Sequence, residues 1–303
     1  MVGRRNLMMG LALTGVGLAA GGGRQGLEWL ARAQSATPKT LTDPTRLLAQ
    51  LESRSTGRLG VAVLDLETGR RYSFRGDERF PMCSVFKWTL AACVLARVDK
   101  GQEDLGRRIV FERTDLQPHS PGTEGHVGLP GLTIAALCEA AITLSDNAAA
   151  NLLLKTVGGP AGLTAWLRGQ GDKVTRLDRW ETALNSAIPG DARDTTSPDA
   201  MVYLLNRLTQ GQALSPASRT RLNAWLTANT TGDARLRAGL PAGWQVGDKT
   251  GSGDRATTND VAVITPPGRR PLLVAAFLTG GPASNDARNA ILADVARVVA
   301  AAV

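Results

Sequence analysis

Strand-like segments stand near both ends of the chain and helix-like segments stand between them, and this order constrains the fold more than any other feature. Residues 59–75 alternate apolar and polar side chains around a turn-forming stretch at 67–70, which is typical of a β-hairpin. Three further strand-like segments cover 244–250, 260–265 and 272–279, with glycine and proline turns between them. The sequence therefore predicts one sheet that takes strands from both ends of the chain.

The middle of the chain has the apolar spacing and the alanine-leucine richness of helices. Helices are predicted at residues 85–98, 133–143, 147–156, 163–167 and 198–209. Two amphipathic segments, 43–51 and 285–302, are predicted to cover one face of the sheet. The expected fold class is α+β, an antiparallel five-stranded sheet flanked by helices, with an inserted all-helical domain.

The predicted sheet domain is discontinuous. It comprises residues 37–80 and 224–303, and the predicted helical domain covers residues 81–223. A chain of 303 residues with 43% hydrophobic residues has enough apolar side chains for a large core. Clefts between such parts are favoured places for small ligands, so a small-molecule site is expected where the two domains meet.

The histidines and cysteines argue against several common catalytic sites. The chain has only two histidines, His119 and His126, and neither a CxxC nor an HExxH spacing, so no metal and no cofactor is expected. It has no GxSxG motif, which makes a Ser-His-Asp triad a poor explanation and leaves lysine or glutamate as the base for a catalytic serine. The three cysteines, Cys83, Cys93 and Cys138, are expected to be free, because two of them lie in apolar helical segments.

The formal charge of +8 permits a nucleic-acid partner, but the distribution of the charges argues against one. Residues 1–33 contain four arginines and one glutamate, so about +5 remains for the rest of the chain. The other arginines are interspersed with acidic residues, and the aromatic content is only 4%. No nucleic-acid partner is therefore expected.

The first 33 residues are typical of a cleaved export signal. Arg4-Arg5 precedes a mild apolar run from Leu7 to Ala20, and Ala31-Arg32-Ala33 offers small residues for a signal peptidase. This run has about 14 residues, against the roughly 20 of a spanning helix, so no stable membrane anchor is expected. The paired arginines followed by Asn6 resemble a twin-arginine leader, although an ordinary secretory leader also fits. The mature protein is expected to be periplasmic or secreted.

Ser84-Val85-Phe86-Lys87 opens an apolar helix, which puts Ser84 near the N-terminal amides and Lys87 on the same face one turn later. A lysine whose pKa is lowered by burial can accept or orient the serine proton, and the helix amides favour an oxyanion. Taken alone, this motif is equally well explained by a helix-capping serine beside a surface lysine.

Two other polar motifs also have structural explanations when each is taken alone. Ser145-Asp146-Asn147 interrupts two alanine-rich helices, where it can cap the second one. Lys249-Thr250-Gly251-Ser252-Gly253 ends a predicted strand, where a glycine lets a ligand approach the backbone closely.

Together, in this order and at these separations, the three motifs are those of class A β-lactamases and penicillin-binding proteins. The chain from about Leu41 to its C-terminus resembles a class A serine β-lactamase. A fourth segment resembles that family's omega loop, because Glu181 is followed four residues later by Asn185. The resemblance places this loop at residues 176–194.

The resemblance implies that Ser84 opens the β-lactam ring of penicillins and cephalosporins and becomes acylated. The backbone N–H groups of Ser84 and Ser252 would form the oxyanion hole. Lys87 and Glu181 both remain candidates for the base in this step. Ser145 would pass a proton to the departing nitrogen in the positive field of Lys249.

The resemblance also implies how the ester is released. Glu181 and Asn185 would hold the water that hydrolyses the ester, which separates a β-lactamase from a trapped target. Arg179 and Asp194 resemble the pair that fixes the ends of the omega loop, although a surface ion pair is usually worth only ~0–1 kcal/mol.

Substrate binding is implied for another set of residues. They are Asn147, Asn185, Arg235, Thr250, Gly251 and Ser252. Asn147 would bind the side-chain amide of the substrate, and Arg235 would support the pocket for its carboxylate, where other members use an arginine at the position of Thr258. His119 stands near the family's gatekeeper position at the entrance, although a surface-loop histidine fits equally well.

The sequence departs from the family in three places. Ala91 and Gly253 stand where some members have the cysteine that pairs with the position of Cys138 or of Cys83, so neither bridge is expected. The second bridge occurs in some carbapenem-hydrolysing members, and its absence weakens a carbapenemase assignment. Thr182 replaces the frequent proline after the glutamate, which leaves a cis peptide bond there open.

Two rival functions share part of this pattern. A D-alanyl-D-alanine peptidase or transpeptidase has the serine, lysine and KTG elements but should lack the segment from Glu181 to Asn185. A sensor that stays acylated normally has a transmembrane tether, and none is visible in the sequence. The predicted function is therefore β-lactam hydrolysis leading to antibiotic resistance, by a monomer whose partners are small-molecule β-lactams.

Overall fold

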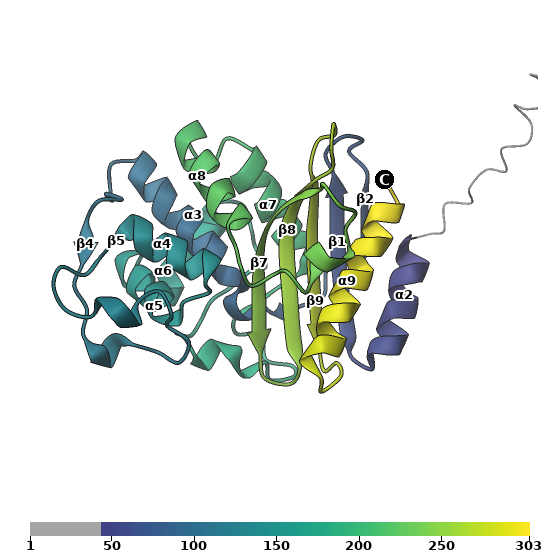
Figure 1. Ribbon diagram of the computed structural model, residues 1–303, viewed down its shortest axis with the longest axis horizontal. Helices are drawn as coiled ribbons and strands as arrows, with labels where there is room; N and C mark the ends of the chain where they lie inside the picture. Colours follow the sequence, from purple (N-terminus) through teal and green to yellow (C-terminus); the bar gives the residue numbers. More distant parts are fainter. Residues whose placement is uncertain (1–43) are drawn as a thin grey trace, which may run out of the picture. The chain divides into compact units, whose positions relative to one another are not determined.

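A computed structural model of the protein describes residues 44–303. The expected export signal, residues 1–33, lies outside the described residues, as does Asp43, the first residue of the predicted helix 43–51. The described residues form one unit, in which helices lie on both faces of a single large sheet (Figure 1).

The sheet has five antiparallel strands in the order β2-β1-β9-β8-β7. These strands are β1 Arg58–Asp65, β2 Arg71–Phe74, β7 Gln245–Gly253, β8 Thr257–Thr265 and β9 Leu272–Thr279. β1 from the start of the chain pairs with β9 from its end, with Arg58 opposite Thr279 and Asp65 opposite Leu272. The predicted fold class and the use of both chain ends are therefore confirmed.

β7 and β8 extend further toward their shared turn than the sequence pattern predicts. Gly253 of β7 pairs with Thr257 of β8, although a glycine-rich sequence is unfavourable for a strand. Two short strand pairs lie outside the large sheet: β3 Phe80–Pro81 with β6 Thr195–Thr196, and β4 Arg108–Ile109 with β5 Leu132–Thr133.

Eight helices are described in this part of the chain. They are α2 Pro44–Ser55, α3 Phe86–Asp99, α4 Ile134–Thr143, α5 Asn147–Thr156, α6 Gly159–Gly169, α7 Pro198–Leu205, α8 Pro216–Thr227 and α9 Asn285–Ala301. The seven predicted helices are all present, and the last turn of the predicted helix 198–209 is a π-helical turn, Asn206–Gln210. α8 was not predicted, because polar residues interrupt its apolar positions, and Asp99 of α3 accepts hydrogen bonds from Ser215 and Ser218 at its start.

Alternate residues of β9 belong to two different apolar cores. Leu273, Ala275 and Phe277 pack with the helices α3, α4, α5 and α7, and Leu272, Val274, Ala276 and Leu278 pack with α2 and α9. Full burial of one large apolar side chain stabilises a fold by about 1.5–3 kcal/mol, so both cores hold the sheet in place. The helices α2 and α9 lie side by side on one face of the sheet, as predicted for residues 43–51 and 285–302 (Figure 1).

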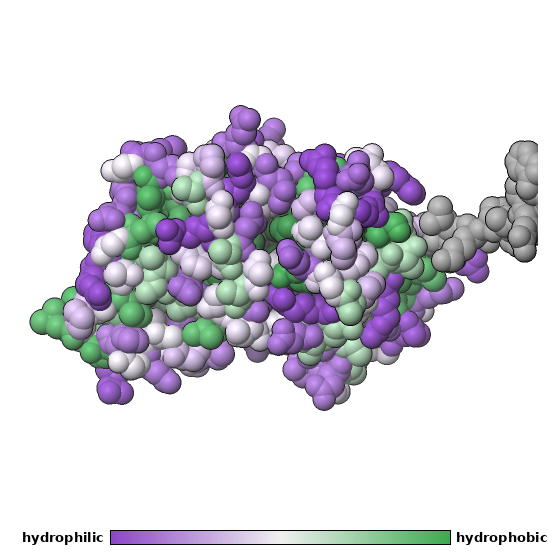
Figure 2. Space-filling model, turned by 45° about the horizontal axis from the view of Figure 1, so that its top comes forward, coloured by the Kyte–Doolittle hydropathy of each residue, from purple (hydrophilic) through white to green (hydrophobic). Residues whose placement is uncertain are grey.

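The surface is chemically mixed over the face shown in Figure 2. One apolar group stands out at the end of the molecule that carries β4 and β5, where Val110 and Leu129 are exposed. Within residues 44–303, no helix combines the length and the apolar character that a membrane crossing requires.

Candidate active site

Ser84 lies in a single 3-10 turn, Cys83–Val85, that leads directly into α3. The sequence predicts that Ser84 opens the helix itself, but the α-helix begins two residues later, at Phe86. Such turns are frequent at helix N-termini. Because the 3-10 turn runs directly into the α-helix, Lys87 still follows Ser84 by one turn. Lys87 falls on the buried side of α3 and is completely inaccessible, while Ser84 keeps 8% exposure.

The ammonium group of Lys87 contacts three groups that come from two other segments. Its Nζ donates to the backbone oxygen of Ser145 at 2.7 Å and to Asn147 Oδ1, and it lies 3.0 Å from Glu181 Oε1. Burial lowers the pKa of Lys87, while the neighbouring Glu181 carboxylate opposes that shift. The structure therefore brings the lysine of the first motif to the serine and asparagine of the second.

The junction between α4 and α5 carries Ser145, Asp146 and Asn147, as predicted. Ser145 has a φ of 57°, a left-handed conformation that is uncommon for residues other than glycine. Asp146 holds this conformation in place, because its carboxylate accepts three backbone N–H groups. One belongs to Ala149 in the first turn of α5, and the other two belong to the loop that precedes α4. The expected helix cap is real, and it also orients the two neighbouring polar side chains.

Glu181 joins Ser84 to the loop at residues 176–194. Its Oε1 accepts a hydrogen bond from Ser84 Oγ at 3.3 Å, and its Oε2 accepts one from Asn185 Nδ2 at 2.7 Å. Glu181 is buried, and Asn185 lies in a 3-10 turn, Ala183–Ser186. The peptide bond between Glu181 and Thr182 is cis, which answers the question that the missing proline leaves open.

Asn151 is a site residue that sequence reasoning missed. Its Nδ2 donates to the backbone oxygen of Glu181 at 3.0 Å, and its Oδ1 accepts the backbone N–H of the same residue at 3.0 Å. It follows Asn147 by four residues on α5, so the two side chains project from the same face of the helix. That spacing was the available signal, and the residue fixes the backbone from which the glutamate extends.

β7 supplies Lys249, which lies beside Ser145 as predicted. Its Nζ is 3.0 Å from Ser145 Oγ and donates to the backbone oxygen of Thr250 at 2.8 Å. The side chain is completely buried, and burial together with the positive charge of Lys87 lowers the pKa of Lys249 well below its usual value. Two ammonium groups thus stand on either side of Ser145.

Gly251 lets β7 pass directly beside the turn that carries Ser84. A Cβ atom on Gly251 would lie 2.5 Å from the backbone oxygen of Met82, so a larger residue cannot keep this approach. Thr250 is buried, with its Oγ1 in hydrogen-bond contact with Thr231 Oγ1. The next residue, Ser252, is exposed, so the edge of the strand offers polar groups to a ligand.

Arg235 is buried behind this edge, where the sequence expects support for a substrate carboxylate. Its guanidinium donates to Ser252 Oγ at 2.7 Å and to the backbone oxygens of Gly251 and Asn259 at 3.0 and 2.6 Å. Its Nε donates to Asn289 Oδ1 at 3.1 Å. All four acceptors are neutral, so the positive charge of Arg235 remains uncompensated by these contacts.

Arg179 and Asp194 close the loop as a partly buried pair. Arg179 Nε lies 2.6 Å from Asp194 Oδ2, and Asp194 Oδ1 accepts the backbone N–H groups of Asp178 and Arg179. Asp194 is only 1% exposed, so this contact is stronger than the surface pair considered from the sequence. Asp178, which sequence reasoning missed, returns the contact by accepting the N–H of Asp194 at 3.0 Å.

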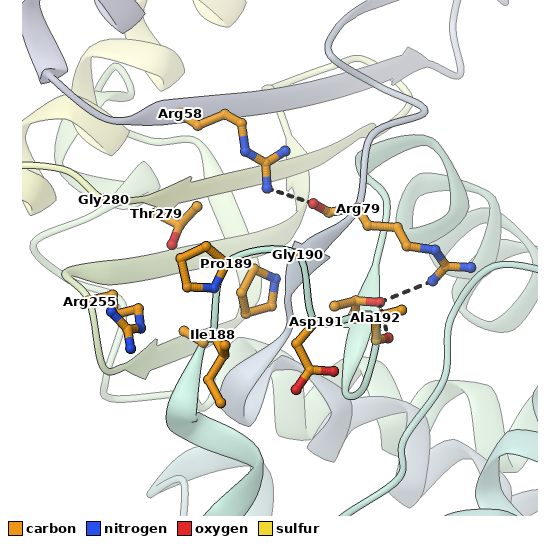
Figure 3. Close-up of a pocket in the computed structure, with 13 residues that line it drawn as sticks. Arg58, Arg79, Ile188, Pro189, Gly190, Asp191, Ala192, Arg255, Thr279 and Gly280 are labelled. Carbon is orange, nitrogen blue, oxygen red and sulfur yellow. Dashed lines mark hydrogen bonds between the residues drawn. The ribbon is translucent and has the colours of Figure 1, made fainter.

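A separate pocket of about 330 Å³ lies between the second half of this loop and the ends of β1 and β9 (Figure 3). Arg58, Arg79 and Arg255 border it on different sides, and Ile188 and Pro189 line it from the loop. No predicted site residue lines this pocket. The two halves of the loop therefore face different surroundings, and only the first half reaches the serine.

The three cysteines, Cys83, Cys93 and Cys138, are buried free thiols. A Cβ atom at Gly253 would lie 2.5 Å from Cys83 Sγ, so the strand leaves no room for a longer side chain there. The exposed ring of His119 has its Nε2 2.9 Å from the backbone oxygen of Leu144, the residue before the junction serine. No group of three or more His, Cys, Asp or Glu side chains within residues 44–303 is arranged to hold a metal ion.

The five residues expected to be catalytic form one connected group. The order of contacts is Ser84, Glu181, Lys87, Ser145 and Lys249. It contains a nucleophilic hydroxyl, a carboxylate that can accept its proton, and a second hydroxyl in contact with the amine of Lys249. Such a group can form a serine ester with a carbonyl compound, protonate the leaving group and activate a water molecule.

Comparison with known proteins gives consistent matches over most of the chain. Residues 43–303 match the family described as "Beta-lactamase enzyme family". The chain is 47% identical over 268 residues to the "Beta-lactamase" of Streptomyces albus G, which covers 86% of this chain and 85% of that protein. Among solved structures it is similar to an ancestral class A β-lactamase, with 64% identity and a TM-score of 0.84 over 85% of this chain and 98% of that one. A class A β-lactamase of the last common ancestor of Gram-negative bacteria gives 64% identity and a TM-score of 0.85 over 86% and 99% of the two chains.

Proposed function

The chain belongs to the class A β-lactamase family and hydrolyses the β-lactam ring, and we propose that it does so through an ester on Ser84 that Glu181 helps to hydrolyse. Resistance to β-lactam antibiotics follows from that activity. The observation that carries the proposal is the position of Glu181, with one oxygen 3.3 Å from Ser84 Oγ and the other 2.7 Å from Asn185 Nδ2. A carboxylate in this place can take a proton first from the serine and later from a water molecule.

In the first step, Ser84 Oγ attacks the lactam carbonyl and loses its proton. The hydroxyl donates to Glu181, which supports Glu181 as the acceptor, while Lys87 stabilises that carboxylate from 3.0 Å. The backbone N–H groups of Ser84 and Ser252 form the proposed oxyanion hole, supported by the close approach of β7 at Gly251. Loss of one such donor typically raises the barrier by about 3 kcal/mol.

Ring opening leaves a negative charge on the lactam nitrogen, which needs a proton. We assign this role to Ser145, whose hydroxyl lies 3.0 Å from Lys249 Nζ. The ammonium group stabilises the hydroxyl as it gives up its proton, and the backbone oxygen of Ser145 also binds Lys87. The positive charges on both sides favour the transfer toward the nitrogen.

Penicillins and cephalosporins are the proposed substrates, because both carry a carboxylate next to the lactam. This carboxylate would be bound by Thr250, Ser252 and Lys249. Arg235 donates a hydrogen bond to Ser252 Oγ, so its positive charge would act on the carboxylate through that hydroxyl. Asn147 would bind the side-chain amide of the substrate. Asn147 Oδ1 accepts a hydrogen bond from Lys87, so the orientation of the Asn147 side chain is fixed before a substrate binds.

Hydrolysis of the ester needs a water molecule on the side of Glu181 and Asn185. Glu181 would accept a proton from that water while Asn185 orients it. Asn151 fixes the backbone of Glu181, and the Arg179–Asp194 pair fixes the start of the loop. Each of these contacts supports a geometry in which the ester is released rather than trapped.

The test is the variant Glu181→Ala mixed with a penicillin. We expect Ser84 to acylate and the ester to persist, so mass spectrometry of the intact protein should show a lasting adduct of the penicillin mass. Asp191→Ala removes a half-buried carboxylate that pairs with Arg193 in the same loop, and it should release its adduct as fast as the unchanged enzyme. Full turnover by Glu181→Ala would refute the assignment.

We also propose that the protein is exported and acts as a monomer. The twin-arginine-like features of residues 1–33 support export to the periplasm or to the medium. The division into a sheet domain, residues 37–80 and 224–303, and a helical domain, residues 81–223, is likewise proposed. Expression of the full chain, followed by N-terminal sequencing of the exported protein and light scattering, tests these points.

A further inference from the structure

Asp260 is a buried carboxyl group next to the segment that carries Arg235, and no proposed reaction step uses it. It lies on β8 opposite Thr250 of β7, and its side chain is completely buried. Its Oδ2 accepts the backbone N–H of Leu236 at 3.2 Å, while its Oδ1 has no hydrogen-bond partner within the described chain. Buried carboxylates are normally paired with a cation, so this environment is unfavourable for a charged group.

Asp248 shows how the neighbouring carboxyl group is compensated. It accepts hydrogen bonds from Asn229 Nδ2 at 2.6 Å and from Arg237 Nε at 3.0 Å. Asp248 and Asp260 project from the same face of the sheet, because Asp260 pairs with Thr250, two residues after Asp248. Burial and the charge of Asp248 raise the pKa of Asp260 well above its usual value.

Charged groups lie near Asp260 on each element packed around it. On its own face of the sheet they are Asp248 on β7, Arg235 and Arg237 on the segment before and within the 3-10 turn Leu236–Gly239, and Arg288 on α9, which binds the neighbouring Thr258. Lys249 projects from the opposite face of β7, but its positive charge still favours the ionised form of Asp260. Of these, Arg237 forms a salt bridge with Asp248. Arg235 is the cation whose position matters for substrate binding.

The protonation state of Asp260 decides how much of the Arg235 charge reaches a substrate. Arg235 and Leu236 are adjacent, so the bond from Leu236 N–H to Asp260 fixes the point where the arginine side chain begins. An ionised Asp260 would offset the positive potential of Arg235 at the edge of β7, where Ser252 is exposed. A neutral Asp260 keeps the anchoring bond and leaves that potential intact.

We propose that Asp260 is a positioning residue for substrate binding, a neutral carboxylic acid that anchors the Arg235 segment without neutralising the arginine. This inference rests on the proposed function, since it concerns the carboxylate of a β-lactam substrate. It explains why a carboxyl group with one backbone donor and one free oxygen is kept in a fully buried place. It also predicts that an uncharged acceptor of the same shape serves equally well.

The experiment compares two variants with the unchanged enzyme on a chromogenic cephalosporin. Asp260→Asn keeps a neutral acceptor for Leu236 N–H, so we expect KM and kcat within about twofold at neutral pH. Asp260→Ala loses the acceptor, so KM should rise by roughly tenfold or more while kcat changes much less, because a buried N–H loses its only partner. In the unchanged enzyme the ionisation of Asp260 should add to the rise of KM at alkaline pH. The rise should therefore be smaller in Asp260→Asn, where loss of the Lys249 proton is the remaining cause.

A penicillin whose carboxylate is esterified separates positioning from general damage. The rise of KM in Asp260→Ala should disappear with the ester, since the ester has no charge for Arg235 to bind. An equal rise for both substrates, or an equally large rise in Asp260→Asn, would overturn the inference. Absence of turnover by the unchanged enzyme would instead refute the proposed function, so the two failures are distinguishable.

One further measurement reports the protonation state of the carboxyl group directly. The ¹³C NMR spectrum of the unchanged protein, labelled at aspartate carboxyl carbons, should contain a resonance of a neutral carboxyl group at pH 7. Its assignment to Asp260 follows from its loss in Asp260→Asn. A spectrum in which every aspartate is ionised at pH 7 would contradict the inference.

Discussion

At the scale of single residues, the site buries two lysines on either side of Ser145. Lys87 and Lys249 are both completely buried, and Glu181 is the carboxylate in direct contact with one of them. Taking an ammonium group out of water is unfavourable, which is why the pKa of each lysine is lowered. Among the described residues, Lys249 has hydrogen-bond contacts only to neutral oxygens, so a carboxylate that enters this place is attracted by its charge.

The lowered pKa of Lys249 has a measurable consequence in alkaline solution. A lysine with a lowered pKa loses its proton at a lower pH than an ordinary lysine, whose value is about 10.4. As that proton is lost, Ser145 loses its positive neighbour, so kcat/KM should fall on the alkaline side. In Lys249→Arg the guanidinium stays protonated, and this fall should move to higher pH even if the maximum rate is lower.

The matched control is Lys155→Arg, because Lys155 is an exposed lysine of α5 paired with Asp115. Its profile of kcat/KM between pH 6 and 11 should overlay that of the unchanged enzyme. An alkaline limb that stays in place in Lys249→Arg would mean that another group controls it.

Single residues also mark the limit of what the sequence predicts about the site. Ser84, Lys87 and Lys249 stand in motifs whose order is informative, and their contacts agree with the expected arrangement. Asn151 and Asp260 stand in no motif, because each acts through the backbone of one residue that is distant in the sequence. Such partners become visible only when the fold brings the two segments together.

At the scale of elements, the loop at residues 176–194 depends on a few buried contacts. It contains one short 3-10 turn and otherwise follows the surface, so few apolar contacts hold it. Asp194 binds two backbone N–H groups and the Arg179 side chain. The loop therefore keeps its shape mainly through polar groups at its two ends.

Asp194→Ala should loosen this loop without unfolding the rest of the molecule. Removal of one partner from a buried, hydrogen-bonded pair typically costs about 3–5 kcal/mol, here mostly as local opening. Hydrogen exchange of the amides in residues 176–194 should accelerate, and hydrolysis of the acyl-enzyme should slow. Asp191→Ala breaks the pair with Arg193 in the same loop and should change neither quantity; loss of protection across the whole sheet in Asp194→Ala would contradict this view.

Element prediction succeeded where one face is buried and failed where distant contacts decide. The strands β1, β2 and β9 and the helix α3 have clear apolar patterns and lie where expected. The extensions of β7 and β8 and the helix α8 depend on pairing and on hydrogen bonds to Asp99, which local patterns do not contain. Local propensity is a weak guide when tertiary contacts oppose it.

At the scale of the whole molecule, the sheet separates two cores, and the buried lysines Lys87 of α3 and Lys249 of β7 lie on the side of the helices α3, α4 and α5. Leu48 of α2 is completely buried in the core on the other side. Leu48→Ala should therefore lower the free energy of unfolding by about 3 kcal/mol, the usual cost of such a cavity. Below the unfolding transition, kcat per folded molecule should be unchanged.

Chemical denaturation followed by fluorescence and by activity measures both quantities. Gln50→Ala, an exposed substitution on the same helix, should shift the free energy of unfolding by less than about 0.5 kcal/mol. A clear loss of kcat in Leu48→Ala well below the transition would show that the two cores are more tightly coupled than the separated packing implies.

The pairing of β1 with β9 has one more consequence. The first described helix, α2, and the last, α9, lie side by side, so the beginning and the end of the described chain meet on one face of the sheet (Figure 1). The two ends of the described chain are therefore close enough for a short linker to join them. Circular permutation should be tolerated, with a short linker from Val303 to Pro44 and new ends cut at the exposed residues 267–268 of the turn before β9. In such a protein β9 would be encoded ahead of β1, while Lys249 would still follow Ser84 and Ser145 along the chain.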